Sequence, residues 1–251
     1  MHQPRGVAIS RDGRWLAAAG QDSFTAIFDL KTRQQVNPPG DGHSHELLSV
    51  RFAGTKSLAS SSDGDARVWD IKSGKQQQTL PLQDKTTTVR GLATSPDGSL
   101  IVTSAFDDTL GVWDRATGKR LREVPIPPQT KPLAVSADRR WIAAGESRRD
   151  EQGNTTSTAI VLRDRATLKV VREWPVSDPR EAAANVDPDR KPSISHVAET
   201  DNGMAFSPDS RFLAWSRLDA LPGIDIVEVE HDRLHASIPV ESPVWCLDFR
   251  N

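Results

Sequence analysis

Residues 89–124 read VRGLATSPDGSLIVTSAFDDTLGVWDRATGKRLREV, and this stretch decides the fold. It contains four short runs that favour β-strands, at 89–94, 99–105, 109–113 and 119–124. Tight-turn residues separate these runs: first Pro-Asp-Gly, then Asp-Asp, then Ala-Thr-Gly. The stretch therefore predicts a four-stranded antiparallel meander.

The same unit recurs along the whole chain. Six residues stand in register near the end of its first strand, at spacings of 43, 42, 41, 71 and 43: Ile9, Phe52, Thr94, Val135, Phe206 and Phe249. The turn after that strand recurs as SRDG, SPDG, SADR and SPDS. The third strand ends in Phe28-Asp29, Trp69-Asp70, Trp113-Asp114 and Arg163-Asp164. A period of roughly forty residues with four strands per unit is typical of propeller repeats.

Because the Trp-Asp pairs, the turns and the period share one register, the chain resembles the WD40 family over nearly its whole length. The resemblance implies an all-β fold, a WD40-like β-propeller with five complete four-stranded blades plus one extra first strand at 244–249. The repeat runs from end to end, so we expect a single domain, 1–251. The preferred explanation of the extra strand is an incomplete seven-bladed ring. We expect the blades at about 6–36, 47–80, 89–124, 131–174 and 202–238.

The composition excludes several classes of partner. Lys and Arg number 32 and Asp and Glu number 34, so no basic excess attracts nucleic acid or an anionic membrane. No apolar run approaches the roughly 18 residues of a membrane helix, and the N-terminus lacks a signal-peptide pattern. We therefore expect a soluble, cytoplasmic protein with neither a nucleic-acid nor a membrane partner. Cys246 is the single cysteine, which excludes an intramolecular disulfide.

A histidine in the second unit is expected to stiffen that blade. Gly42-His43 lies 26 residues before Trp69, as in WD40 repeats. The resemblance implies a hydrogen-bonded network of His43, a serine at Ser60 or Ser61, Asp63 and Trp69, in which buried polar groups satisfy one another. A metal site is the alternative, with His43 and His45 as weak candidate ligands. The network is the preferred interpretation, and no cofactor is expected.

Three segments exceed what the repeat requires: 146–158, 175–201 and 217–223. The first two lack strand or helix periodicity and are expected to be irregular surface loops. Because alternate turns of a meander lie at alternate ends, all three segments are expected at one face, where binding residues often concentrate. The candidate partner-binding residues are Glu146, Arg148, Arg149, Asp150, Arg190, Lys191, His196, Arg217 and Asp219.

No sequence pattern typical of nucleophilic, metal-dependent or phosphate-binding catalysis occurs, so no enzymatic activity is expected. We predict a non-catalytic scaffold that binds a protein or peptide through the face of the three long segments. One alternative is a structural propeller segment of a larger multidomain or oligomeric assembly, with self-association through open blade faces. Another is a metal- or small-molecule-dependent activity near 41–46 or at the propeller axis.

Overall fold

The computed structural model describes residues 4–20, 23–37, 42–80, 82, 87–128, 130–149, 155–175, 203–217, 222–242, 244 and 247–249. The chain divides into two compact units, Met1–Pro125 and Ile126–Asn251. Strands and turns make up the described ranges, which contain no helix, so the all-β prediction is confirmed. Accordingly, nothing helical in them is long and apolar enough to span a bilayer.

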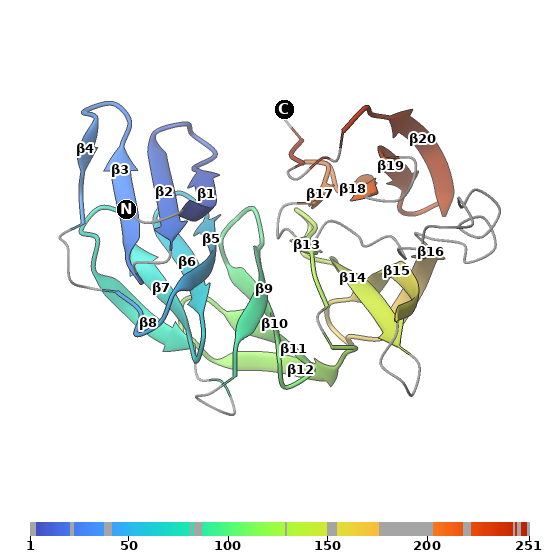
Figure 1. Ribbon diagram of the computed structural model, residues 1–251, viewed down its shortest axis with the longest axis horizontal. Helices are drawn as coiled ribbons and strands as arrows, with labels where there is room; N and C mark the ends of the chain where they lie inside the picture. Colours follow the sequence, from blue (N-terminus) through green and yellow to red (C-terminus); the bar gives the residue numbers. More distant parts are fainter. Residues whose placement is uncertain are drawn as a thin grey trace, which may run out of the picture. The chain divides into compact units, whose positions relative to one another are not determined.

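The first unit contains three four-stranded antiparallel sheets, in which each strand pairs with the next along the chain (Figure 1). The strands of the first sheet are β1 (Pro4–Ile9), β2 (Trp15–Gly20), β3 (Thr25–Asp29) and β4 (Gln34–Gln35). Those of the second are β5 (Leu47–Ala53), β6 (Ser57–Ser62), β7 (Ala66–Asp70) and β8 (Gln76–Leu80). Those of the third are β9 (Val89–Thr94), β10 (Leu100–Ala105), β11 (Thr109–Asp114) and β12 (Arg120–Pro125).

The second unit contains two more sheets of the same topology. The first comprises β13 (Leu133–Val135), β14 (Trp141–Arg149), β15 (Thr155–Asp164) and β16 (Val170–Pro175). The second comprises β17 (Met204–Phe206), β18 (Phe212–Arg217), β19 (Gly223–Glu228) and β20 (Arg233–Pro239). The five complete four-stranded blades expected from the repeat are therefore confirmed as sheets.

The expected extra strand at 244–249 is not formed by its described residues. Residues 244 and 247–249 belong to no strand, and 245–246 lie outside the described residues. A strand needs a neighbour to complete its backbone hydrogen bonds. Residues 244 and 247–249 have no such neighbour among the residues that the structure describes.

The core of the first unit lies between consecutive sheets. Side chains alternate along a strand, so every second one of β2 faces the next sheet. Trp15 and Ile27 pack with Val50, Leu58 and Trp69 of the second sheet, and all five are buried. The second unit has an equivalent core between its two sheets, which includes Trp141, Ile160, Leu213 and Trp215.

A self-contained turn joins the first and second strands in four of the five sheets. Its serine donates a hydrogen bond to the Asp two positions later at 2.5–2.6 Å and accepts one from the backbone N–H five positions later at 2.9–3.0 Å. The four pairs are Ser10 and Asp12, Ser95 and Asp97, Ser136 and Asp138, and Ser207 and Asp209. This bonding explains the recurring Ser-x-Asp sequence.

The aspartate that ends the third strand closes the next turn. Asp70, Asp114 and Asp164 each accept two hydrogen bonds, from the hydroxyl and from the backbone N–H of the Ser or Thr three positions later. These hydrogen bonds lower the pKa of all three carboxyls below the usual value. The aspartate of the Trp-Asp pair is therefore a turn-closing residue.

Candidate functional site

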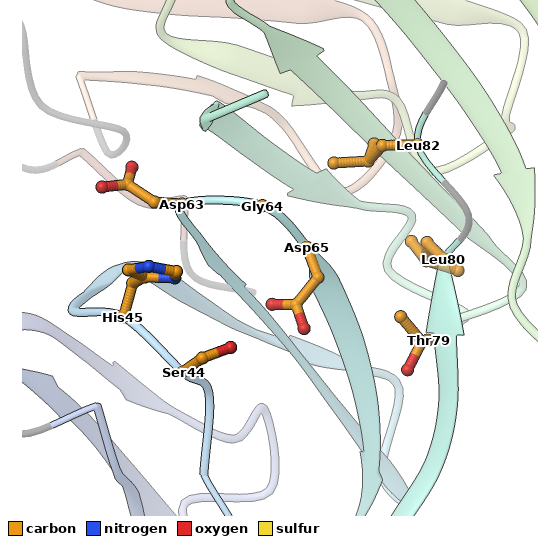
Figure 2. A pocket seen from close by; sticks show the side chains of 8 residues that line it. All are labelled: Ser44, His45, Asp63, Gly64, Asp65, Thr79, Leu80 and Leu82. Atoms are coloured by element: carbon orange, nitrogen blue, oxygen red, sulfur yellow. The ribbon is translucent and has the colours of Figure 1, made fainter. Parts of the chain in front are cut away.

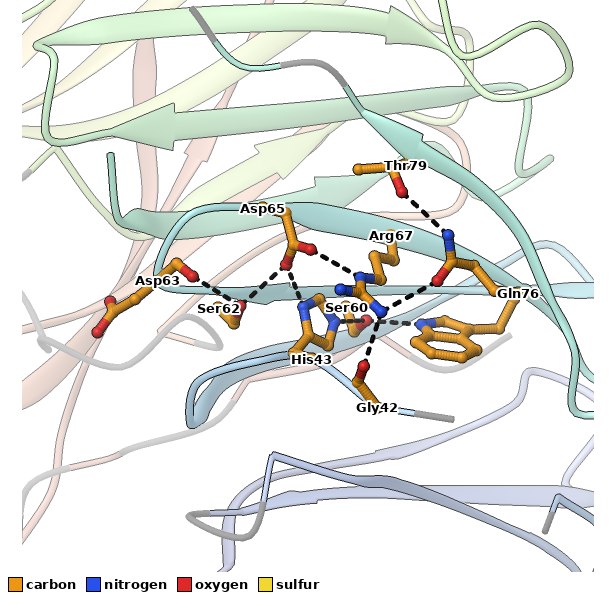
Figure 3. A network of polar contacts seen from close by, with 10 residues as sticks. Gly42, His43, Ser60, Ser62, Asp63, Asp65, Arg67, Gln76 and Thr79 are labelled. Carbon is orange, nitrogen blue, oxygen red and sulfur yellow. Dashed lines mark hydrogen bonds and ion pairs between the residues drawn. The ribbon is translucent and has the colours of Figure 1, made fainter. Parts of the chain in front are cut away.

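A chain of buried hydrogen bonds crosses the second blade (Figure 3). The indole N–H of Trp69 donates to Ser60 Oγ at 2.7 Å, and Ser60 Oγ lies 2.6 Å from His43 Nε2. The other ring nitrogen, Nδ1, contacts the carboxylate of Asp65. A neutral imidazole with its proton on Nδ1 satisfies every group, because each then donates or accepts in turn.

Asp65, not the expected Asp63, is the acid of this network. Asp63-Gly64 occupies the centre of the β6–β7 turn, which the Ser62 N–H closes on the Asp65 carbonyl at 3.0 Å. Asp65 therefore comes directly before β7, where its side chain reaches His43. Of the two candidate serines, Ser60 provides the hydroxyl, and Ser61 Oγ has no partner among the described residues.

Burial and hydrogen bonding shift the pKa of both ionisable groups in this network. Burial disfavours the charged ring and so lowers the pKa of His43 below 6.5. This effect outweighs that of Asp65, which acts in the opposite direction. Burial alone would raise the pKa of Asp65, but its interactions with His43 and Arg67 are stronger and lower that pKa to about 2. Asp65 therefore carries its negative charge throughout the neutral pH range.

Arg67 extends the network toward the outer strand. Its Nε lies 2.7 Å from Asp65 Oδ2, and its Nη1 donates to the Gly42 carbonyl at 2.7 Å and to Gln76 Oε1 at 3.0 Å. Ser62 Oγ donates a further bond to Asp65 at 3.0 Å. Both carboxylate oxygens of Asp65 are thus occupied within the blade.

A cavity of about 350 Å³ lies beside this network (Figure 2). Three parts of the second blade line it: Ser44 and His45 before β5, the turn 63–65, and Thr79, Leu80 and Leu82 at and after the end of β8. Figure 2 shows His45 and Asp63 on one side and the two leucines, Leu80 and Leu82, on the other. The cavity therefore combines an acidic side with an apolar side.

The described residues offer little support for the metal alternative. Both ring nitrogens of His43 already have partners, Asp65 and Ser60, so this residue cannot act as a free ligand. Nowhere in the described ranges do three or more His, Cys, Asp or Glu side chains gather in a way that could hold a metal ion. Both nitrogens of His43 are accordingly engaged within the second blade.

In the second unit, the described parts of the segment 146–158, residues 146–149 and 155–158, form strands and not the irregular loop that was expected. β14 and β15 continue to pair through Glu146 and Ala159, Ser147 and Thr158, Arg148 and Ser157, and Arg149 and Thr155. The ladder has nine residue pairs, whereas the corresponding ladder between β10 and β11 has five. Threonines on β15 explain the difference, since β-branched residues favour strands.

Glu146 is also not the exposed binding residue that was expected. Its carboxylate lies 2.6 Å from Arg163 Nη2, and the two side chains are 10% and 8% exposed. Pairing with Ile142 places Arg163 where the second and third blades hold Trp69 and Trp113. Because arginine is longer than tryptophan and charged, it reaches a buried acid in place of a hydroxyl.

Arg148 and Arg217 remain accessible at the same end of the second unit. The Asp138 N–H donates to Ser210 Oγ at 3.0 Å, which joins the β13–β14 turn to the β17–β18 turn. Since alternate turns of a meander lie at alternate ends, the β14–β15 hairpin and the β18–β19 turn share the opposite end. The side chains of Arg148 and Arg217 are 60% and 22% exposed, and they pair with Glu173 and Asp225.

The other candidate binding residues cannot be placed. The side chain of Arg149 and the whole of Asp150, Arg190, Lys191, His196 and Asp219 lie outside the described residues. Sequence reasoning also missed Asp65, Arg67 and Arg163. An available signal was Asp63-Gly64, a dipeptide that favours the centre of a two-residue hairpin and so points to Asp65 as the next strand residue.

Comparison with known proteins identifies the repeat. A family model described as "WD domain, G-beta repeat" matches residues 37–70 and 74–114. A guanine nucleotide-binding protein subunit beta of Lymnaea stagnalis is 36% identical over 94 residues, which cover 36% of this chain and 27% of that protein. A poly(A)+ RNA export protein of Schizosaccharomyces pombe is 31% identical over 107 residues, 41% of this chain and 30% of that protein. The chain thus spans less than a third of the length of either relative.

Proposed function

This chain contains WD40 repeats, and from that premise we propose that it is a non-catalytic scaffold that binds a protein partner. WD40 repeats generally serve as interaction platforms, although a fold alone does not define a function. One relative is named as a subunit of a guanine nucleotide-binding protein, and so as a component of an assembly. The proposed binding surface is the insertion face, the end of the second unit's sheets that carries 146–158, 175–201 and 217–223.

The extended β14–β15 ladder is the observation that carries the proposal. Four residue pairs beyond the length of the β10–β11 ladder hold the hairpin in a fixed geometry. A preordered surface loses little conformational freedom on binding, which favours association. β16 ends at Pro175 opposite Ala159, so the segment 175–201 starts from this same end.

The charges of the insertion face favour a polar partner surface. Arg148 pairs with Glu173 at 2.7 Å, and these side chains are 60% and 36% exposed. An exposed ion pair contributes at most about 1 kcal/mol, so a partner's charges can replace either member at little cost. Arg217 adds a second, less exposed cation at this end.

A hairpin truncation tests the proposal. Replacing 148–157 by Asn-Gly joins Ser147 to Thr158, which already face each other, through a two-residue turn. Glu146 and its ion pair with Arg163 remain in place, so the blade should still fold. The wild type and the truncated chain are each used to capture proteins from a source lysate. Any protein that only the wild type captures is identified and purified, and its affinity for the two chains is then measured by titration.

A matched control replaces Asp107-Asp108 in the β10–β11 turn by Asn-Gly, which alters the equivalent turn of a blade outside the insertion face. We expect the control to retain the partners of the wild type and the truncated chain to lose them. If the truncated chain unfolds like the wild type and still captures the same proteins with the same affinity, the insertion face is not the binding surface.

A further inference from the structure

We propose that the cavity beside the β6–β7 turn binds the basic side chain, lysine or arginine, of a partner protein. This basic side-chain pocket is formed by Ser44 and His45, the turn 63–65, and Thr79, Leu80 and Leu82. It belongs to the first unit, so it is a second site that does not depend on the insertion face of the second unit.

The size of the pocket suits a single side chain. Its volume is about 350 Å³, near the lower end of the roughly 300–1,000 Å³ of pockets that enclose small molecules. A long, narrow side chain with one polar end can enter such a space while the rest of its chain stays on the surface. A large cofactor would be left mostly outside the pocket.

Asp63 supplies the charge that would hold the basic group. The two carboxylates of the lining differ, because both oxygens of Asp65 are taken by His43, Ser62 and Arg67. The carboxylate of Asp63 has no hydrogen bond or ion pair among the described residues. The described lining also contains no lysine or arginine, so no such side chain among the described lining residues neutralises the charge of Asp63.

The opposite side of the pocket suits the aliphatic stem of such a side chain. Leu80 and the partly buried Leu82 line this side, and Leu82 packs against the core cluster that contains Leu80 and Trp113. Lysine and arginine bury their methylene groups against apolar surface while their charged ends reach polar groups. The separation of the leucines from Asp63 across the pocket provides both environments at once (Figure 2).

The walls of the pocket are fixed before any ligand arrives. Asp65 is held by the network of the second blade, and the Gly64 N–H donates to the Thr87 carbonyl at 3.1 Å. Figure 3 shows Thr79 tied to Gln76, which in turn contacts Arg67. A preorganised site of this kind reduces the cost of ordering upon binding.

Two other ligand classes fit the pocket less well. An anion would face Asp63 and Asp65 without any cation in the described lining. A divalent metal ion needs several free oxygen or nitrogen ligands, and the oxygens of Asp65 are already engaged. A monovalent organic cation with an apolar stem is the chemistry that matches the lining.

Nuclear magnetic resonance titration of the full chain tests the proposal. The probe is the peptide Ala-Ala-Arg-Ala-Ala, acetylated and amidated, and the comparison peptide carries citrulline, which has the same shape without the charge. We expect the arginine peptide to bind with a dissociation constant on the order of 1 mM and to shift the amide signals of Gly64 and Thr79. The citrulline peptide should bind about three to tenfold more weakly.

Two substitutions localise the effect. Asp63→Asn removes the charge but keeps the shape, and should weaken arginine-peptide binding about three to tenfold. Asp108→Asn makes the same change in the β10–β11 turn of the next blade and should leave binding unchanged. Asn is compatible with the φ of 57° at Asp108, so this control should fold normally.

The result that would overturn the proposal is equally specific. Equal binding of both peptides, or equal binding by Asp63→Asn and the wild type, would show that Asp63 does not hold a basic group. Amide shifts confined to residues remote from Gly64 and Thr79 would place the binding elsewhere. The hairpin truncation should leave this titration unchanged, so each of the two proposals can be contradicted without affecting the other.

Discussion

Arg163 and Glu146 form an ion pair of 2.6 Å inside the fourth blade, where Arg163 stands at the position that the second and third blades fill with a hydrogen-bonded tryptophan. The guanidinium takes the place of an indole, and a carboxylate two residues beyond the usual hydroxyl position receives it. The same position of the repeat therefore holds a tryptophan hydrogen-bonded to a hydroxyl in the second and third blades and an arginine paired with a carboxylate in the fourth.

Glu146→Ala should destabilise the chain by about 3 kcal/mol, because it leaves the charge of Arg163 buried without its partner. Urea-induced unfolding followed by tryptophan fluorescence measures the loss. Glu173→Ala breaks the exposed pair with Arg148 in the same sheet and should cost less than about 1 kcal/mol. Equal losses for the two variants would show that the Arg163 pair is not effectively buried.

Ser60→Ala should cost about 2 kcal/mol or more, since it leaves the indole N–H of Trp69 and Nε2 of His43 buried without partners. The neighbouring Ser61 is equally buried, but its Oγ has no partner among the described residues. Ser61→Ala should therefore change stability by less than about 1 kcal/mol. Thermal unfolding of both variants makes the comparison, and similar midpoints would contradict the assignment of Ser60 to the network.

Gly98→Ala should be more harmful than Gly13→Ala, although both glycines have a positive φ, 72° and 68°. The conformational strain of roughly 1–2 kcal/mol is common to both. A Cβ on Gly98 would lie 2.3 Å from the carbonyl carbon of Ala53, whereas one on Gly13 would meet nothing within 4 Å. We expect a further loss of about 1–3 kcal/mol for Gly98→Ala in urea unfolding. Equal losses would mean that the β9–β10 turn around Gly98 does not lie in close contact with Ala53.

Acidification from about pH 7 to about pH 5 should reduce the free energy of unfolding. The pKa of His43 is lowered by burial, so below 6.5 the unfolded chain binds a proton that the folded chain does not. Stability is therefore lost as the pH falls through 6.5 toward the folded pKa. Asp65 adds a loss in the same direction between pH 3.8 and its folded pKa of about 2. Urea titrations at successive pH values measure both.

A pair of histidine substitutions identifies the source of this pH dependence. His43→Gln should lower stability at neutral pH and flatten the decline between neutral pH and the folded pKa of His43. His45→Gln removes an exposed histidine and should retain the slope of the wild type. A wild-type slope in His43→Gln would mean that other groups control the acid sensitivity.

The sequence was sufficient to predict the features that depend on nearby residues. The third blade was expected at 89–124 and spans 89–125. Its turns are closed by hydrogen bonds that Ser95 donates to Asp97 and Thr117 donates to Asp114. Such short-range bonds are encoded by the same residue types in every repeat. Their recurrence also made the count of complete blades predictable.

Features that depend on register across strands were harder to predict. Asp63 and Asp65 are both acidic and two positions apart, and only the placement of the β6–β7 turn decides which reaches His43. Glu146 lies in an insertion without a counterpart in the repeat, so its pairing with Arg163 could not be inferred from other blades. The cavity beside Asp63 is lined by three separate segments, so no local sequence pattern predicts it.

The Ser-x-Asp turn has a consequence for how this kind of chain changes through evolution. The bonds that its serine and aspartate side chains make within the turn join residues no more than five positions apart, as for Ser10 and Asp12 in the turn from Ser10 to Trp15. A gene duplication that copies one blade therefore copies all the residues that make these bonds within the turn. The His43 network, by contrast, joins residues 17 and 22 positions apart and is lost when any one of its members mutates. Whole blades can thus be gained readily, while the network within each blade is free to decay or to be rebuilt, as Arg163 and Glu146 illustrate.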